Sequence, residues 1–295
     1  MNDADGAVPG DVTVVIATRN RRRELCRTLA RLAELPERPP VVVVDNDSGD
    51  GTAAMVHARF PAVTMVELPR NLGAAARNQG VRQARTPYVA LSDDDSWWAP
   101  GALGRAAGLL AAHPRLGVIA ARMLVEPGGE PDPINGVLAA SPLPRDGLPG
   151  PRVLGFLACG AVVRRSAFLG VGGFASLLFI GGEEELLAYD LAASGWAAVY
   201  VPEVVAHHQP SAIRDTGQRR MFEARNHALI AWLRRPPGTA LRLTAGLARR
   251  ARREPAAVHA LAGLLRCAPR AVIGRRRLPA DVEAGIRLLE AGHAR

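Results

Sequence analysis

The sequence predicts an α/β protein whose mostly parallel sheet is flanked by helices and followed by a helical C-terminal extension. Short apolar runs alternate with amphipathic stretches from Asp11 to about Ala120, which is typical of strands joined by crossover helices. A polar cluster follows each of the four apolar runs. Beyond Arg235, apolar residues recur at helical spacing with arginines between them, and this pattern predicts amphipathic helices.

The expected strands are continuous apolar runs, as strands buried on both faces of a sheet should be. They cover residues 12–17, 39–45, 62–68 and 88–91. The expected helices between them cover residues 21–35, 51–60 and 73–84. The alternation weakens after about Met123. Residues 126–152 are rich in Pro and Gly, which predicts a long loop, and such loops are usually functional or disordered.

The net charge of +9 is concentrated at the C-terminal end of the chain. Residues 236–295 hold twelve arginines against four acidic side chains, and they contain no Phe, Tyr or Trp. The missing aromatic residues argue against nucleic-acid binding, which commonly stacks bases on aromatic rings. Basic amphipathic helices bind anionic membrane surfaces, so we expect weak membrane contact through residues 238–295. The alternative is a solvated helical face that covers the core.

The cysteines and the N-terminus predict a cytoplasmic protein. Cys26, Cys159 and Cys267 are far apart and match neither a disulfide framework nor a zinc spacing. The first residues are acidic and polar, unlike a signal peptide. No apolar stretch reaches the length expected of a membrane span. If the extension binds lipid, the protein is attached peripherally to the inner face of the cell membrane.

Three consecutive aspartates, Asp93 to Asp95, follow the fourth expected strand. Ligands of such sheets bind at the carboxyl ends of the strands, and a hard divalent cation prefers oxygen ligands. A cation held there could neutralise a diphosphate and make it a good leaving group. A solvated acidic turn is the alternative for the triplet on its own.

Seven segments together resemble the family 2 glycosyltransferases, which have a GT-A fold. In chain order they are VTVVIATRNR, VVVVDNDSGDGT, RNLGAAARNQG, YVALSDDDSWWAP, GAVVRRSAFLGVGGF, GGEEELL and GWAAVYVPEVVAHH. The resemblance spans about Val12 to Arg235. It implies a GT-A domain over residues 11–235, with a donor half at 11–125 and an acceptor half at 126–235. Residues 236–295 form the basic extension.

The resemblance implies that a nucleotide-sugar donor binds at the first strand ends. The matching positions are Ala17, Thr18, Asn20, Asp45, Asn46, Asp47, Arg77 and Asp93. Asn46 can donate and accept at a pyrimidine edge, which favours a UDP- or dTDP-sugar without separating the two. The alternative for Asn46 and Asp47 is an Asx-type turn. Arg77 is expected near the diphosphate or base, or else is a plain surface arginine.

The resemblance also implies a Mn²⁺ or Mg²⁺ ion bound by Asp94, with Asp93 and His208 as further ligands. Ser92 stands where many relatives have a first aspartate, so the ligand pair stays open at this point. Asp95 alternatively caps the following turn.

Three further positions are expected around the sugar or the acceptor: Trp97, Gly160 and Glu185. For Trp97 and its neighbour Trp98, packing in the core is the alternative.

The GGEEE segment is expected to supply the catalytic base. The resemblance places this role on Glu184, with Glu183 in reserve, while stabilisation of a helix N-terminus is the alternative. The predicted function is inverting transfer of a sugar from a pyrimidine nucleotide diphosphate to a hydroxyl of a glycan, lipid-linked or cell-envelope acceptor. The oligomeric state is left open.

Three other functions would each leave a different mark on the sequence. A nucleotidyltransferase would need a glycine-rich loop after the first strand, which IATRNRRRE lacks. A non-catalytic homologue would have lost acidic residues that this chain keeps. A dinucleotide-dependent oxidoreductase would need the G-x-G-x-x-G pattern after that strand, and the chain does not have it.

Overall fold

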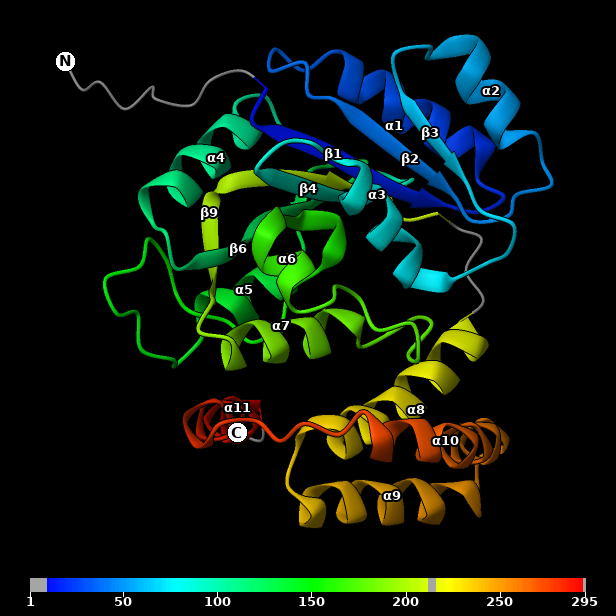
Figure 1. Cartoon of the computed structure of the whole chain (residues 1–295), viewed down its shortest axis with the longest axis vertical. Coiled ribbons are helices and arrows are strands. Elements are labelled where there is room, and N and C mark those ends of the chain that lie inside the picture. Colours follow the sequence, from blue (N-terminus) through cyan, green and yellow to red (C-terminus); the bar gives the residue numbers. More distant parts are fainter. Residues whose placement is uncertain (1–9, 212–215, 294–295) are drawn as a thin grey trace.

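The computed structural model describes residues 10–211 and 216–293, which build one nine-stranded sheet covered by helices (Figure 1). The strands are β1 (Val12–Thr18), β2 (Val41–Asp45), β3 (Thr64–Glu67), β4 (Tyr88–Asp93), β5 (Ser96–Trp98), β6 (Leu116–Val125), β7 (Glu130–Pro131), β8 (Ala161–Arg164) and β9 (Ala197–His208). The α-helices are α1 (Arg22–Ala33), α2 (Thr52–Arg59), α3 (Arg77–Gln83), α4 (Ala102–Ala112), α5 (Ile134–Ala139), α6 (Arg165–Gly170), α7 (Glu183–Ala193), α8 (Thr216–Arg234), α9 (Pro237–Ala251), α10 (Pro255–Ile273) and α11 (Ala280–His293). Two short 3₁₀ helices, η1 (Gly73–Ala76) and η2 (Ala158–Gly160), complete the elements.

The N-terminal half forms the expected parallel sheet. Strand β1 pairs in parallel with β2 and β4, and β2 pairs in parallel with β3. Val14, Val15 and Ile16 of β1 are fully buried because helices cover both faces of the sheet. The four strands expected from the sequence are confirmed, with β2 and β3 shorter than predicted. Their carboxyl ends therefore lie along one edge.

The C-terminal half extends the same sheet with antiparallel strands. Strand β8 runs antiparallel to both β4 and β6, and β9 runs parallel to β6 and antiparallel to β5. In the β5–β9 pair, Ser96 is opposite His208 and Trp97 is opposite His207. The end of β9 therefore lies beside the turn that carries Asp93 to Asp95.

The long loop expected over residues 126–152 is found only in part. Residues 126–139 contain β7 and helix α5, and residues 140–152 contain no helix or labelled strand. Asn135 of α5 is buried and bonds both backbone groups of Met123: its Oδ1 accepts from N at 2.9 Å and its Nδ2 donates to O at 2.8 Å. This pair of bonds fixes α5 against β6.

The predicted C-terminal helical extension is confirmed as α9, α10 and α11. These helices pack on α7 and α8 around one apolar cluster that includes Leu186, Leu229, Leu247 and Leu264. The proposed boundary after residue 235 falls between α8 and α9, and this cluster continues across it. One sequence expectation is corrected here: α10 is long and apolar enough to cross a membrane by length and composition alone.

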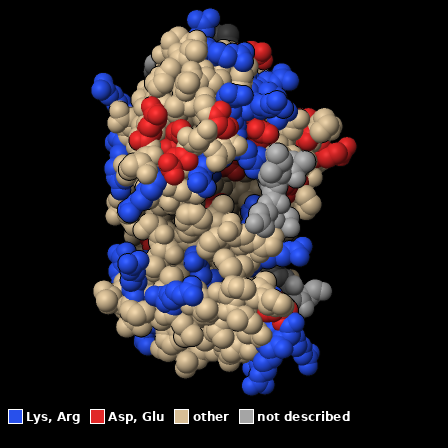
Figure 2. All heavy atoms as spheres, turned by 90° about the vertical axis from the view of Figure 1, so that its right-hand side faces the viewer, with Lys and Arg blue, Asp and Glu red and all other residues tan. Residues whose placement is uncertain are grey.

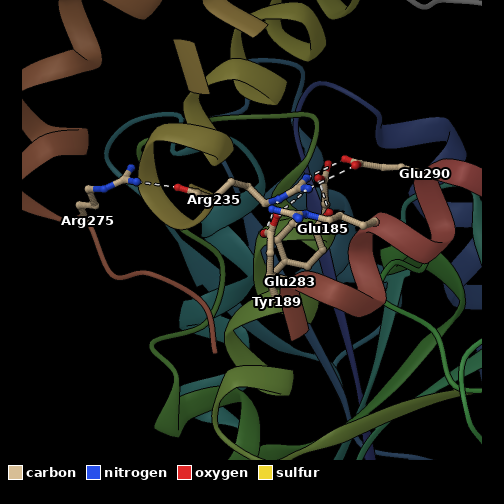
Figure 3. Close-up of polar contacts among 7 residues, drawn as sticks. Glu185, Tyr189, Arg235, Arg275, Glu283 and Glu290 are labelled. Carbon is tan, nitrogen blue, oxygen red and sulfur yellow. Dashed lines mark hydrogen bonds and ion pairs between the residues drawn. The ribbon is translucent and has the colours of Figure 1, made fainter. Parts of the chain in front are cut away.

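Buried ion pairs join the extension to the rest of the protein. The Arg235 side chain is buried at the end of α8, and its Nε and Nη1 donate to Glu283 and Glu290 of α11, each at 2.7 Å (Figure 3). Arg275 donates to the Arg235 carbonyl oxygen at 2.6 Å. The neighbouring Arg234 bonds Asp190 of α7 at 2.5 and 2.8 Å. Charge-assisted bonds of this kind hold α7, α8 and α11 in a fixed relation.

Candidate active site

A cavity of about 910 Å³ lies at the carboxyl ends of the parallel strands, between the two halves of the sheet. Figure 2 shows a hollow on this side of the molecule with acidic and basic side chains around it. Nine of the predicted site residues line the cavity: Ala17, Thr18, Asn46, Arg77, Asp93, Asp94, Glu183, Glu184 and His208. Its position agrees with the general rule for ligand sites of α/β sheets.

Asp94 is a buried carboxylate on the sheet side of the cavity. Its Oδ2 accepts a hydrogen bond from Thr18 Oγ1 at 2.8 Å, and its backbone oxygen accepts one from Thr28 Oγ1 at 2.8 Å. Burial, reinforced by the neighbouring carboxylates of Asp93 and Asp95, raises the pKa of Asp94 to about 7, against the opposing effects of Thr18 and Arg21. The turn that carries Asp93 to Asp95 thus concentrates negative charge, and the hydrogen bonds to Asp94 offset only part of it.

Ser92 and Asp95 have other contacts. The Ser92 hydroxyl is fully buried and accepts a hydrogen bond from Trp98 Nε1 at 3.0 Å. Asp95 is also buried, its Oδ1 lies 3.3 Å from His208 Nε2, and its Oδ2 accepts from the Ser211 backbone at 3.4 Å. Asp95 therefore connects the aspartate turn to the end of β9.

The donor set at this wall fits a divalent cation. Asp93, Asp94, Asp95 and His208 offer carboxylate oxygens and one imidazole nitrogen, which suit Mn²⁺, and the carboxylates alone suit Mg²⁺. Within residues 10–211 and 216–293, no three such side chains already form a group that could hold a metal ion. Asp93 is bonded to Arg77 and His208 faces Asp95, so binding a metal requires these side chains to exchange partners.

Arg77 connects the two acidic walls of the cavity. It begins α3, and its Nη2 donates to Asp93 Oδ1. Burial alone would lower the pKa of Arg77, but the carboxylates of Asp93, Glu183 and Glu184 outweigh burial and raise it. The guanidinium is therefore a buried cation within reach of both acidic segments, and it is not a plain surface arginine.

Glu183 and Glu184 form the opposite wall at the start of α7. Glu183 is buried, and its Oε2 has no hydrogen-bond partner in the described part of the chain. Glu184 is partly exposed to the cavity, and its Oε1 accepts from the Ala158 backbone N at 3.4 Å. Burial and the adjacent Glu183 raise the pKa of Glu184 to about 8, and burial raises the pKa of Glu183.

Two glycines allow these glutamates to enter the cavity. Gly181 and Gly182 have φ values of 84° and 85°, a conformation that side chains with a Cβ disfavour. A Cβ on Gly182 would lie 2.9 Å from Ile230 Cδ1 of α8, and one on Gly181 would lie 3.0 Å from Glu223 Cγ. Close packing of α8 on this turn thus demands glycine at both positions.

The donor-side loop is held by Asn46. Its Oδ1 accepts from the Leu72 backbone N at 2.7 Å and its Nδ2 donates to the Gly73 oxygen at 3.0 Å. Gly73, with φ 61°, packs against the Phe179 carbonyl, which also accepts from Ala74 N at 2.7 Å. Asn46 therefore shapes the cavity by fixing the donor-half loop that contacts Phe179 of the acceptor half.

Three predicted donor residues are outside the cavity lining and form a pair of turns. The Asn20 side chain accepts from Gly49 N at 2.8 Å, and Asp45 Oδ1 accepts from Ser48 N at 3.2 Å. Asn20 and Asp47 have φ values of 53° and 67°. The Asp45–Ser48 bond is the local side-chain-to-backbone bond of an Asx-type turn, whereas the Asn20–Gly49 bond ties the loop after β1 to the loop after β2.

The three predicted acceptor-pocket residues do not line the cavity either. Trp97 packs on the core with its ring stacked on His207 at 5.6 Å. A Cβ on Gly160 would lie 2.2 Å from Met123 Sδ, so this glycine permits close packing. Glu185 accepts from Tyr189 Oη at 2.8 Å, in the group that surrounds Arg235 (Figure 3).

No sequence pattern indicated the α8 residues that complete the cavity: Gln218, Arg219, Phe222 and Glu223. Phe222 lies 5.3 Å from Phe179, centroid to centroid, and Arg219 donates to Glu223 at 2.9 Å. Arg19, Arg21 and Asn71 also line the donor side. These three belong to the polar clusters TRNR and RNLG at the strand ends, a signal that could have identified them.

Comparison with known proteins defines the class. The fold and the acidic cavity are those of a sugar-transferring enzyme with a GT-A sheet, and a family model described as Glycosyl transferase family 2 matches residues 13–170. The N-acetylglucosaminyl-diphospho-decaprenol L-rhamnosyltransferase of Mycobacterium tuberculosis is 32% identical over 239 residues, covering 68% of this chain and 78% of the relative. The chain belongs to glycosyltransferase family 2.

Other similar proteins are consistent with this assignment. The pre-mycofactocin glycosyltransferase of M. tuberculosis is 30% identical over 246 residues, which cover 78% of this chain and 49% of that protein. The mannosyltransferase PcManGT from Pyrobaculum calidifontis, solved with GDP-Man and Mn²⁺, superposes with a TM-score of 0.59 at 22% identity over 96% of this chain and 87% of that one. S. aureus TarS 1–349 with UDP-GlcNAc gives a TM-score of 0.57 at 18% identity over 75% and 66%. The expected GT-A fold is confirmed.

Proposed function

We propose that this glycosyltransferase moves a sugar, with inversion, from a nucleotide diphosphate to a hydroxyl of a lipid-linked acceptor. One observation carries the proposal: two acidic segments, one with Asp93 and Asp94 and one with Glu183 and Glu184, line opposite walls of a single cavity with Arg77 between them. Such a cavity can hold a diphosphate against one wall and a general base at the other.

The reaction that we propose is a direct displacement. The acceptor oxygen forms a bond to the anomeric carbon, the bond from that carbon to the diphosphate oxygen breaks, and the hydroxyl proton moves to a glutamate. We assign the proton to Glu184, because it is more exposed to the cavity than Glu183 and its Oε1 is oriented by Ala158 N. Arg77 would hold the diphosphate, since a guanidinium matches phosphate geometry.

A divalent cation would bind to Asp94, with Asp93 and His208 as the other candidate ligands. When bound, it would supply positive charge to the departing diphosphate. The pyrimidine preference that we propose for the donor now has weaker support, because the Asn46 amide already bonds Leu72 and Gly73. A panel of UDP-, dTDP- and GDP-sugars in thermal unfolding, with and without Mn²⁺, tests it. We expect larger shifts with UDP- or dTDP-sugars, since only bound ligands stabilise the native state.

The lipid-linked acceptor is supported by apolar side chains in the cavity lining. They include Ile134, Val137, Ile180 and Phe222, and Val137 and Ile180 are exposed. The rhamnosyltransferase relative is named for a decaprenol diphosphate substrate. Arg219, which also lines the cavity, offers a cation to an acceptor phosphate.

The test is a transfer assay with a labelled nucleotide sugar and a polyprenyl-diphosphate glycan. We expect the product to have the anomeric configuration opposite to the donor, as read by NMR coupling constants. Glu184→Gln should reduce turnover by about 10²–10⁴-fold with unchanged donor binding, and Glu203→Gln, an exposed carboxylate of β9, serves as the matched control. Retention of configuration, or full activity in both Glu184→Gln and Glu183→Gln, would exclude this mechanism.

A further inference from the structure

The C-terminal helices have an unusual concentration of exposed apolar side chains. Across residues 10–211 and 216–293, eight large apolar side chains are exposed, and two of these, Val137 and Ile180, line the cavity. The other six belong to α9, α10 and α11: Leu241, Val258, Leu265, Val272, Ile273 and Leu288. Exposed apolar residues that gather on one part of a protein indicate an interaction surface.

Helix α10 presents most of this surface. Val258, Leu265 and Val272 are spaced by seven residues, so they form one stripe along the helix. Leu265 is 63% exposed, Val272 is 61% exposed and the adjacent Ile273 is 86% exposed. The inner face of the same helix, with Ala257, Ala260, Leu264 and Ala271, is buried in the cluster shared with α8 and α9. Burial inside the protein therefore does not explain the outer stripe.

Helix α9 adds one apolar residue at the same level. Only Arg252 to Glu254 join α9 to α10, and so short a connection makes the two helices antiparallel neighbours. Leu241 lies ten residues before the end of α9, and Leu265 lies ten residues after the start of α10. Leu241 is 58% exposed, so α9 also presents a large apolar side chain to solvent.

Arginines border this surface. Arg266 and Arg270 are exposed on α10, about 80° and 120° around the helix from Val258 at 100° per residue, and Arg242 is exposed beside Leu241. Figure 2 shows the part of the molecule below the hollow, with uncharged surface between groups of basic side chains and few acidic ones. An apolar strip with a basic border matches the acyl and headgroup layers of an anionic bilayer.

We propose that α10, together with the first turns of α9, docks on an anionic lipid surface. The helix lies in the plane of the interface, with Leu265, Val272 and Ile273 at the acyl boundary and Arg266 and Arg270 at the headgroups. It does not cross the bilayer, because its inner face is part of the protein core. Apolar area and basic charge add in binding of this kind.

The docked surface connects to the cavity through α8. The first residues of α8 line the cavity, and its later residues pack against α9 and α10. This nineteen-residue helix is about 28 Å long at 1.5 Å per residue. This inference extends the proposed function and rests on it at this point. If the acceptor is lipid-linked, the membrane that carries it would lie within one helix length of the cavity.

Sedimentation of the full chain with vesicles tests the proposal. Phosphatidylcholine vesicles with about 30% phosphatidylglycerol serve as the anionic surface, and pure phosphatidylcholine vesicles serve as the neutral one. We expect binding to the anionic vesicles only, and weaker binding at higher salt. Leu265→Gln/Ile273→Gln should weaken it by about ten-fold or more. Arg266→Gln/Arg270→Gln should weaken it by about 25-fold, at about five-fold for each arginine.

The matched control is Arg85→Gln/Arg105→Gln, which removes two exposed arginines outside the extension. It should bind like the wild type, and all variants should keep the wild-type Tm because the substituted side chains are exposed. Wild-type protein that stays in the supernatant, or an apolar variant that binds normally, overturns the proposal. Protein that resists carbonate extraction also overturns it, since that result indicates a spanning helix. The proposal also fails if the wild type is a dimer, the apolar variant is a monomer, and neither of them binds vesicles.

The assay needs neither donor nor acceptor, so its outcome is separate from that of the proposed function. The same variants should show the wild-type thermal shift with a nucleotide sugar. If vesicle binding follows the expected order while no nucleotide sugar shifts the Tm, the proposed function fails and the docking surface stands.

Discussion

Replacing Glu184 with glutamine should make the protein more stable at alkaline pH while removing its activity. In the native state the pKa of Glu184 is raised from 4.5 to about 8, first by burial and then by Glu183. Arg77 and the Ala158 N–H oppose that rise without cancelling it. The native state therefore holds a proton that the unfolded chain releases, and stability falls as pH rises from about 4.5 to about 8. Below that window the carboxyl is protonated in both states.

The size of the effect follows from linkage. Each pKa unit is worth about 1.4 kcal/mol, so the full difference corresponds to at most about 5 kcal/mol. The effect of the variant should be smaller, because Glu184 is partly exposed to the cavity and glutamine keeps its contact with Ala158. At pH 8 we expect the free energy of unfolding of Glu184→Gln to exceed that of the wild type by about 1–3 kcal/mol. For a chain of this size that gain corresponds to a Tm rise of roughly 2–5 °C.

The assay is thermal unfolding of wild-type and Glu184→Gln protein between about pH 4 and pH 9, the range that brackets both pKa values. The two should converge below about pH 4 and separate steadily above it, with Glu203→Gln following the wild type throughout. Wild-type kcat should rise with pH and level off above about pH 8, since a base must be deprotonated to accept a proton. A variant that is less stable than the wild type at pH 8, or a kcat that falls across this range, would refute the reasoning.

Three further substitutions test other parts of the site. Asp94→Ala should abolish transfer and the Mn²⁺-dependent part of nucleotide binding measured by calorimetry, as excess chelator should in the wild type; unchanged metal dependence would remove Asp94 from the ligand set. Asn46→Ala should lower the free energy of unfolding by about 1–3 kcal/mol and weaken nucleotide binding, because the bonds to Leu72 and Gly73 are lost; equal stability would contradict this. Gly182→Ala should destabilise by about 1–2 kcal/mol or more, whereas Gly108→Ala in α4, where a Cβ meets nothing within 4 Å, should stabilise by up to about 1 kcal/mol.

The donor side of the site could be predicted from the sequence because it follows from local rules. Four apolar runs joined by helices predict parallel strands, and parallel strands bring their carboxyl ends to one edge. Thr18, Asn46 and Asp94 meet there as expected. What the rule could not show is how each side chain is used: Asn46 bonds the loop at Leu72 and Gly73, and Asn20 bonds Gly49 in the loop after the neighbouring strand.

The acceptor side depends on contacts that are distant in sequence. No local pattern indicates that Glu184 comes near Arg77, or that α8 completes the cavity with Phe222. The resemblance to the family identified the glutamates, and it could not supply α8. Adjacent positions also differ in direction: residues alternate between the faces of a strand, so His208 lines the cavity while His207 stacks on Trp97 outside it.

The direction of Glu185 has a consequence for how the catalytic helix is held. Successive residues of a helix turn by about 100°, so three consecutive glutamates cannot all face the cavity. Glu183 and Glu184 face it, and Glu185 instead accepts from Tyr189, beside the buried Arg235 that pairs with two glutamates of α11. Asp190, near the end of the same helix, bonds Arg234. Helix α7 is thus bonded to an arginine at the end of α8 through Asp190, and the repulsion between Glu183 and Glu184 acts on a helix that is held in place by its neighbours. A repelling pair on a loosely packed helix would separate and lose the raised pKa, whereas here the geometry that raises it is maintained by the C-terminal helices.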